Sequence, residues 1–145
     1  MPVYVPEVHQ RLSQVLPPTV LAATQDLSWF YVALVVATVI PILVVLVATT
    51  GRRSRGAAWA VVFVQSLFLV NVFVPHLPAA VVLGGYAPGV ATAVGINLPY
   101  SVYFVRRSVR EGEVSRSEAA LAVGVSVPAL VLGLGVLYFV VGRLV

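Results

Sequence analysis

Four long apolar stretches without a charged residue alternate with short polar segments along the chain of 145 residues. They lie at about residues 29–48, 57–74, 90–105 and 119–141. A helix needs about 20 predominantly apolar residues to cross the hydrocarbon core of a bilayer. The pattern therefore predicts an all-α fold, an integral membrane bundle of four transmembrane helices that occupies residues 28–145.

Residues 1–27 follow a different pattern. Apolar residues recur there at helical spacing, at Val5, Val8, Leu12 and Val15, with polar residues between them and a pair of prolines after them. An amphipathic pattern of this kind is typical of a helix that lies in the plane of the membrane surface. We therefore expect an N-terminal amphipathic interfacial segment ahead of the bundle.

The composition agrees with a membrane protein. Hydrophobic residues make up 60% of the chain and charged residues only 10%, whereas a soluble domain is usually about a quarter charged. So few charges cannot cover a surface that faces water. The chain also has no cysteine, which excludes disulfides, thiolate metal sites and a cysteine nucleophile.

The distribution of arginine predicts the orientation in the membrane. Seven of the nine basic residues lie in two short segments, residues 51–56 and 106–118, and all nine are arginine. In a bundle of four spans these segments share one side, and positive charge marks the cytoplasmic side. We expect a multi-pass protein of the cell membrane whose termini and segment 76–88 lie outside. The lipid bilayer is its expected partner. Nucleic acid is not expected, because the chain has no basic helix or aromatic platform.

Polar residues that are candidates for chemistry gather on the predicted outer side. All acidic residues lie outside the apolar stretches, so a relay of carboxylates across the membrane is not expected. His76 is flanked by prolines near the end of a predicted span. Because histidine gains and loses a proton near neutral pH, His76 is a candidate metal ligand or acid–base group. The alternative is a polar residue that only reaches toward the interface.

Three amides lie within the apolar stretches, at Gln65, Asn71 and Asn97. An amide in hydrocarbon needs a hydrogen-bond partner, and a neighbouring helix usually supplies one. We expect these amides to join helices, with a substrate pocket between helices as the alternative.

Small residues recur four positions apart, a spacing that lets helix backbones approach closely. The pairs are Gly89 with Ala93, Ala91 with Gly95, and Ala129 with Gly133. The spacing fits packing within the chain and also contacts with a second copy or a partner membrane protein. The chain shows no internal repeat, nucleophile elbow, phosphate-binding loop or HExxH sequence.

The middle of the chain resembles a known family. An Asn and a His near a helix end, Asn71 and His76, are followed by Tyr86-Ala87-Pro88-Gly89-Val90-Ala91-Thr92, by Leu98-Pro99 and by a basic loop. This order resembles the HXXEE domain family, whose members are small multi-helix membrane proteins of bacteria and archaea. The resemblance covers roughly residues 57–110.

The chain departs from the family pattern at two points. The defining His-x-x-Glu-Glu motif is absent, because no acidic pair follows His9, and we expect the chain to begin beyond the helix that carries this motif. Asn71 lies five residues before His76, where the resemblance implies about four, and Pro75 is a candidate for the extra residue.

The resemblance implies a polar site at the outer membrane face, made by His76, Tyr86, Asn71 and Thr92. In an enzyme, His76 would be the acid–base or metal-ligating group, and Tyr86 and Asn71 would orient the substrate or the imidazole. The same residues are also explained as a structural corner, in which glycine allows a tight turn and threonine bonds to its own backbone.

A divalent metal would need more ligands than His76 supplies. The further candidates on the same side are His9, Glu7 and Asp26. Three functions therefore stay open at this point. They are a membrane protein of unassigned activity with a polar or metal site, a non-catalytic scaffold or subunit, and a small oligomeric transporter or channel.

Overall fold

A computed structural model describes residues 10, 13–14, 27–51, 54–82, 84–85 and 89–144. The described residues form helices and turns and contain no strand, which confirms the all-α prediction. The amphipathic segment predicted for residues 1–27 falls almost entirely outside the described residues.

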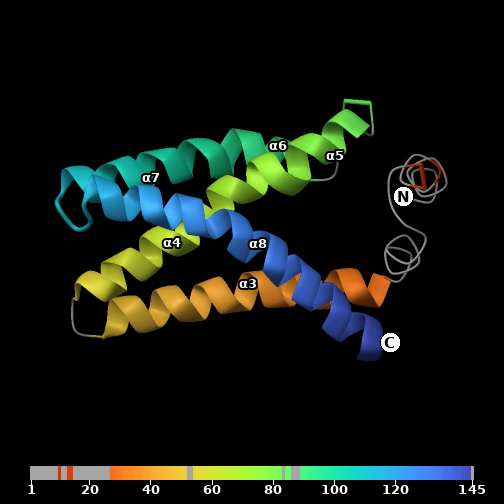
Figure 1. Ribbon diagram of the computed structural model, residues 1–145, viewed down its shortest axis with the longest axis horizontal. Coiled ribbons are helices and arrows are strands. Elements are labelled where there is room, and N and C mark those ends of the chain that lie inside the picture. The colour runs from red at the N-terminus through yellow and green to blue at the C-terminus, as the bar shows by residue number, and fades with distance from the viewer. Residues whose placement is uncertain are drawn as a thin grey trace.

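The first half of the bundle consists of two long helical stretches (Figure 1). Helix α3 spans Leu27–Thr50. The second stretch is continuous, because α4 (Arg55–Asn71) passes through a π-helical turn, η1 (Val72–His76), into α5 (Leu77–Val82). The sequence pattern predicted that this span ends at residue 74, just before Pro75. The helix instead continues through both prolines, with Pro75 within the π turn and Pro78 in α5.

The second half has the same construction. Helix α6 (Val90–Thr92) passes through a π turn, η2 (Ala93–Asn97), into α7 (Leu98–Arg110), and α8 spans Arg116–Leu144. The helix predicted to end at residue 105 thus extends into the basic segment. Its last turns carry Arg107 and Arg110, and basic groups are favourable near the C-terminal end of a helix.

Side chains and glycine set the helix ends at the arginine-rich end. The Ser54 hydroxyl accepts a 3.1 Å hydrogen bond from the backbone N–H of Ala57 and caps α4. Gly112, with φ of 74°, follows the end of α7 and permits the left-handed conformation there. Ser115 and Glu118 then form a reciprocal capping box, in which the Glu118 N–H donates to the Ser115 hydroxyl and the Ser115 N–H donates to the Glu118 carboxylate.

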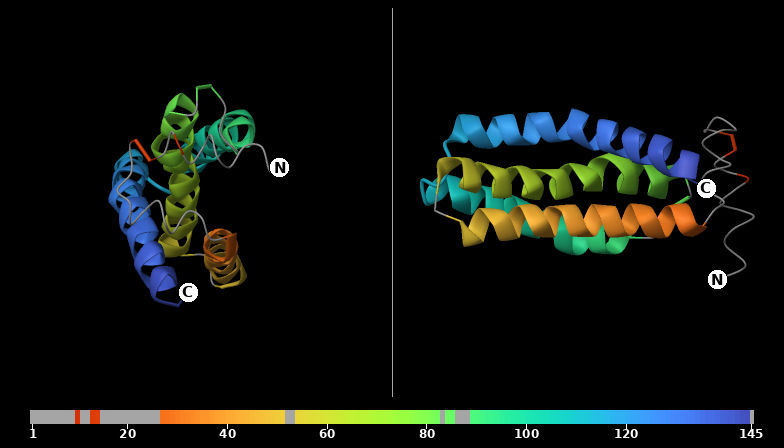
Figure 2. Two further views of the ribbon diagram at one scale, coloured as in Figure 1. Left: turned by 90° about the vertical axis from the view of Figure 1, so that its right-hand side faces the viewer. Right: turned by 90° about the horizontal axis from the view of Figure 1, so that it is seen from below.

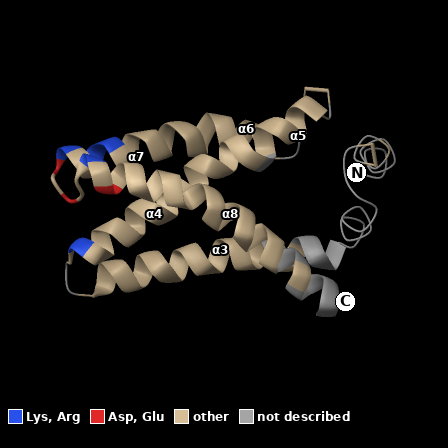
Figure 3. Cartoon of the chain, viewed as in Figure 1, with Lys and Arg blue, Asp and Glu red and all other residues tan. Residues whose placement is uncertain are grey.

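Helix α4 is the central element of the bundle, in contact with α3, α7 and α8. Figure 2 shows α3, α4 and α8 side by side along the long axis, with the α3–α4 and α7–α8 connections at the same end. The arginines and acids of residues 55–118 gather at this end (Figure 3), which we call the arginine end. Helix α5 and the start of α6 lie at the opposite end (Figure 1).

One buried hydrophobic cluster lies near the arginine end. Val62, Val114, Ala119 and Ala122 are buried there, and the indole of Trp59 stacks on Phe63 at 5.4 Å between ring centroids. Small residues at the start of α8 let that helix lie close to α4. Large apolar side chains also face outward, such as Val47 of α3, 73% exposed, and Leu132 of α8, 67% exposed.

Two helical stretches in the described part are long and apolar enough to cross a membrane, Arg55–Val82 and Arg116–Val136. Leu34–Thr50 is a shorter apolar helix. The helical stretch over residues 90–110, which contains the third predicted span of 90–105, is not among these candidates; Asn97 and the final arginines interrupt its hydrophobic pattern.

Candidate functional site

The imidazole of His76 lies directly against the backbone of Gly89. A Cβ atom at position 89 would come within 3.0 Å of His76 Cε1 and 3.4 Å of Nδ1. Gly89 also has φ of 84°, a conformation that residues with a side chain rarely adopt. Both the space and the backbone conformation therefore require glycine. The structure thus brings together a histidine at the end of one helix and a glycine at the start of the next.

Thr92 of α6 belongs to the same structure, and we call His76, Gly89 and Thr92 together the His76 corner. Its hydroxyl donates a 2.9 Å hydrogen bond to the carbonyl of Gly89. The expectation that threonine bonds to its own backbone is confirmed. The bond stabilises the first turn of the helix, whose N-cap is the glycine on which His76 rests.

The π turn η1 explains the spacing of Asn71 and His76. The N–H of Leu77 donates to the carbonyl of Val72, five residues back, instead of four. This turn of the helix therefore contains one extra residue. Residues five apart lie above one another on the same face, as residues four apart do in an α-helix. Asn71 and His76 lie one turn apart in spite of the longer spacing.

The second π turn repeats this arrangement. In η2 the N–H of Leu98 donates to the carbonyl of Ala93, again five residues back. Each π turn ends in a polar residue followed by Leu-Pro, His76-Leu77-Pro78 in one and Asn97-Leu98-Pro99 in the other. Each has another polar residue five positions earlier, Asn71 and Thr92. Sequence inspection missed this short shared pattern, and the paired Leu-Pro sequences were its visible signal.

The two π turns contact each other across the bundle. Single π turns inside α-helices occur frequently at functional sites. The side chains of His76, Asn71 and Asn97 are half-buried, and none forms a hydrogen bond with a residue that the structure describes. A buried polar group without a partner is costly. These three side chains can therefore offer an imidazole and two amides to a ligand.

The remaining predicted site residues fall outside the described residues. These are Tyr86 of the proposed polar site and His9, Glu7 and Asp26 of the proposed metal site. In the described part, no group of three or more His, Asp or Glu side chains comes together to hold a metal. His76 can supply one imidazole nitrogen to a metal, and the other ligands stay a prediction.

One predicted amide bridge is confirmed, between α4 and α7. The Gln65 side chain donates a 2.7 Å hydrogen bond to the hydroxyl of Ser101, which is fully buried. The Ser126 hydroxyl of α8 likewise approaches the carbonyl of Ser66 in α4 at 3.3 Å. These bonds join helices through their buried faces and offer no open polar path.

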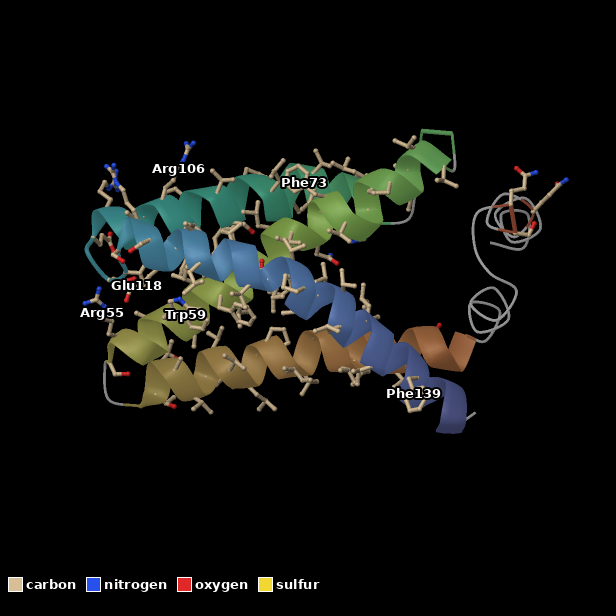
Figure 4. The ribbon with its side chains drawn as sticks, viewed as in Figure 1. Arg55, Trp59, Phe73, Arg106, Glu118 and Phe139 are labelled. Carbon is tan, nitrogen blue, oxygen red and sulfur yellow. The ribbon has the colours of Figure 1, made fainter. Side chains whose placement is uncertain are left out.

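The arginine end contains an ion pair between helices that sequence inspection did not identify. Arg55 of α4 binds both oxygens of Glu118 in α8, and the Trp59 indole donates to the Glu118 carbonyl at 3.3 Å (Figure 4). The hydrogen bond from Arg55, and then those from the N–H and hydroxyl of Ser115, lower the pKa of Glu118 to about 2. The Ser-x-x-Glu sequence at 115–118 was the signal for this structure.

These features define a small helical-bundle protein whose described part has two helices apolar enough to cross a membrane and a corner of two π turns at one end. The chain belongs to the family described as a protein of unknown function with HXXEE motif, whose family model matches residues 1–104. The match extends beyond the segment on which the resemblance was based, to the start of the chain. No curated protein and no solved structure matches the chain.

Proposed function

We propose that this family member is an integral membrane protein of four spans that binds a polar ligand or metal at its outer face. Its membrane location is supported by α3, which is apolar on all sides and exposes large side chains such as Val35 and Val47. A contiguous apolar surface of this kind is unfavourable in water and favourable against lipid. The spans would be about residues 29–48, 57–74, 90–105 and 119–141.

The orientation follows from the arginine end. Positive charge marks the cytoplasmic side, so segment 76–88 and both chain ends would lie outside the cytoplasm. This places His76 and Gly89 at the outer rim of the bilayer, where a ligand can enter from water.

The observation that carries the proposed ligand site is the imidazole of His76, which is half-buried on Gly89 without a hydrogen-bond partner among the described residues. An imidazole in this setting can bind a metal, accept a proton or donate a hydrogen bond. Asn71, one helical turn away, and Tyr86 of the same motif would orient the ligand. A bound divalent metal would take further ligands from His9 and Glu7.

The test is metal content and ligand-dependent stability of the purified full chain. We expect His76→Ala to abolish the rise in Tm given by the bound metal or polar ligand in a screen of divalent metals and small polar compounds. His9→Ala distinguishes the two kinds of ligand, since it should weaken the response only if the ligand is a metal. An unchanged response in His76→Ala protein of normal helicity would eliminate the site.

A second candidate is a non-catalytic membrane subunit, supported by open glycine faces. No described side chain approaches the position where a Cβ of Gly95 or Gly133 would stand. Such faces allow close approach of another helix. Native mass in a mild detergent would reveal the complex, and Gly133→Leu should dissociate it. A monomer in several mild detergents would count against this candidate.

A further inference from the structure

A groove of about 810 Å³ runs along one face of the helical stretch that η2 and α7 form. Its apolar part is lined by Val94, Leu98, Pro99 and Val102. Its other end is lined by arginines, at positions 106, 107 and 110, near the arginine end of the bundle. The groove is thus lined by apolar side chains at one end and by a cluster of positive charge at the other.

Two of these arginines have no partner within the described part of the chain. Arg107 pairs with Glu111 through a 2.7 Å bond and approaches the hydroxyl of Tyr103 at 3.4 Å. Arg106 and Arg110 form no hydrogen bond or ion pair with a described residue. They lie four residues apart, so they share one face of α7, and Arg106 projects away from the other helices (Figure 4).

The dimensions of the groove match one leaflet of a bilayer. From Leu98 to Arg110 the helix rises by about 18 Å at about 1.5 Å per residue. Half of the hydrocarbon core measures about 15 Å. An acyl chain beside Leu98 and Val102 would therefore place its headgroup at the level of the arginines.

We propose that this groove binds an anionic phospholipid of the cytoplasmic leaflet, its phosphate held by Arg106 and Arg110 and an acyl chain held along the apolar face of α7. Guanidinium groups bind phosphate through paired hydrogen bonds, and anionic lipids are found in the cytoplasmic leaflet. An acidic peptide fits less well, because its backbone would leave polar groups unsatisfied against the apolar part of the groove.

The experiment uses the delipidated full chain in a mild non-ionic detergent. Native mass spectrometry measures its binding of dioleoyl phosphatidylglycerol and dioleoyl phosphatidylcholine. The lipid site predicts at least tenfold tighter binding of phosphatidylglycerol. Arg106→Gln and Arg110→Gln should each weaken that binding roughly fivefold, the effect of one basic residue near an anionic membrane surface.

Arg116→Gln is the matched control. It removes the same charge from the same end of the bundle, at an exposed position that does not line the groove. Binding by this variant should stay within twofold of the unaltered chain. An equal loss in Arg116→Gln and Arg106→Gln would show only general attraction between charges and would overturn the site.

Two further arms separate the occupants. Dihexanoyl phosphatidylglycerol and soluble glycerol phosphate should bind more weakly than the long-chain lipid, and equal binding would overturn the role of the apolar groove. Displacement of the lipid by an equal concentration of a glutamate decamer would assign the arginines to an acidic protein instead.

The inference rests on the membrane location proposed above. Absence of the protein from the membrane fraction would overturn both proposals. A membrane-embedded protein that binds the two lipids equally would overturn the lipid site alone.

Discussion

Gln65 donates a 2.7 Å hydrogen bond to Ser101, and this bond fixes the register between two antiparallel helical stretches. His76 lies eleven residues beyond Gln65 in one stretch, and Gly89 lies twelve residues before Ser101 in the other. The same register therefore places the imidazole opposite the glycine. A buried polar pair near the middle of the bundle thus helps to position the corner at its outer end.

Removal of this pair should loosen the corner. Ser101→Ala leaves the Gln65 amide without its partner, and amide bonds between membrane helices contribute about 0.6 to 2 kcal/mol. We expect a loss of this size in the free energy of unfolding in detergent. A double-mutant cycle with Gln65→Leu isolates the coupling, and a coupling energy of zero would contradict the assigned role.

The contact between His76 and Gly89 gives a second prediction. Gly89→Ala should destabilise the protein by about 1 to 3 kcal/mol, because it combines a strained backbone with a 3.0 Å contact to the imidazole. The change in unfolding free energy is measured by circular dichroism in detergent.

Gly95→Ala is the matched control for this substitution. Its Cβ meets no described atom within 4 Å, and its φ is not in the left-handed region. Since alanine favours helix by about 1 kcal/mol over glycine, this variant should be as stable as the unaltered chain or more so. Equal destabilisation by both substitutions would remove the argument for a specific contact.

The ion pair between Arg55 and Glu118 makes stability depend on pH at the arginine end. The pKa of Glu118 is lowered to about 2 from 4.5 by Arg55 and Ser115. The folded state therefore favours the ionised carboxylate. Its contribution is fully present above pH 4.5 and is lost as the pH falls toward 2. Unfolding in detergent between pH 2 and 7 measures this loss.

Glu118→Gln should remove this part of the pH dependence and lower stability at neutral pH. Glu113→Gln is the control, because Glu113 is exposed and forms no ion pair with a described residue. If both variants retain the acid-induced loss, another carboxylate is responsible.

The sequence was sufficient to predict the helices and several residues of the corner. Charge-free apolar stretches predict helices because the hydrophobic pattern is local. The Pro-Gly pair before Val90 similarly predicted a turn, and Gly89 has the conformation that a turn requires. The continuation of the second helix past Pro75 was not predicted, because a π turn depends on the hydrogen-bond pattern of the whole helix and not on one residue.

Contacts between distant residues were also beyond prediction. Arg55 and Glu118 lie 63 residues apart in the sequence, and only the packing of α4 on α8 makes them a pair. Gln65 was expected to bond across helices, but its partner Ser101 could not be chosen among the many serines of the chain. The residue type predicts that a side chain needs a hydrogen-bond partner, but only the fold determines which residue becomes that partner.

The absence of cysteine permits a direct test of the proposed orientation. Single cysteines at Ser117, exposed near the arginine end, and at Val81, 80% exposed near the His76 corner, can be labelled in intact cells with a membrane-impermeant maleimide. Because positive charge is retained on the cytoplasmic side, Val81→Cys should react in intact cells. Ser117→Cys should react only after the membrane is permeabilised.

The two variants are controls for each other, since both must react in detergent solution. Reaction of Ser117→Cys in intact cells, with protection of Val81→Cys, would reverse the orientation and place His76 toward the cytoplasm. Reaction of both without permeabilisation would contradict the four-span arrangement, because the α3–α4 and α7–α8 connections could then not be shielded by the membrane.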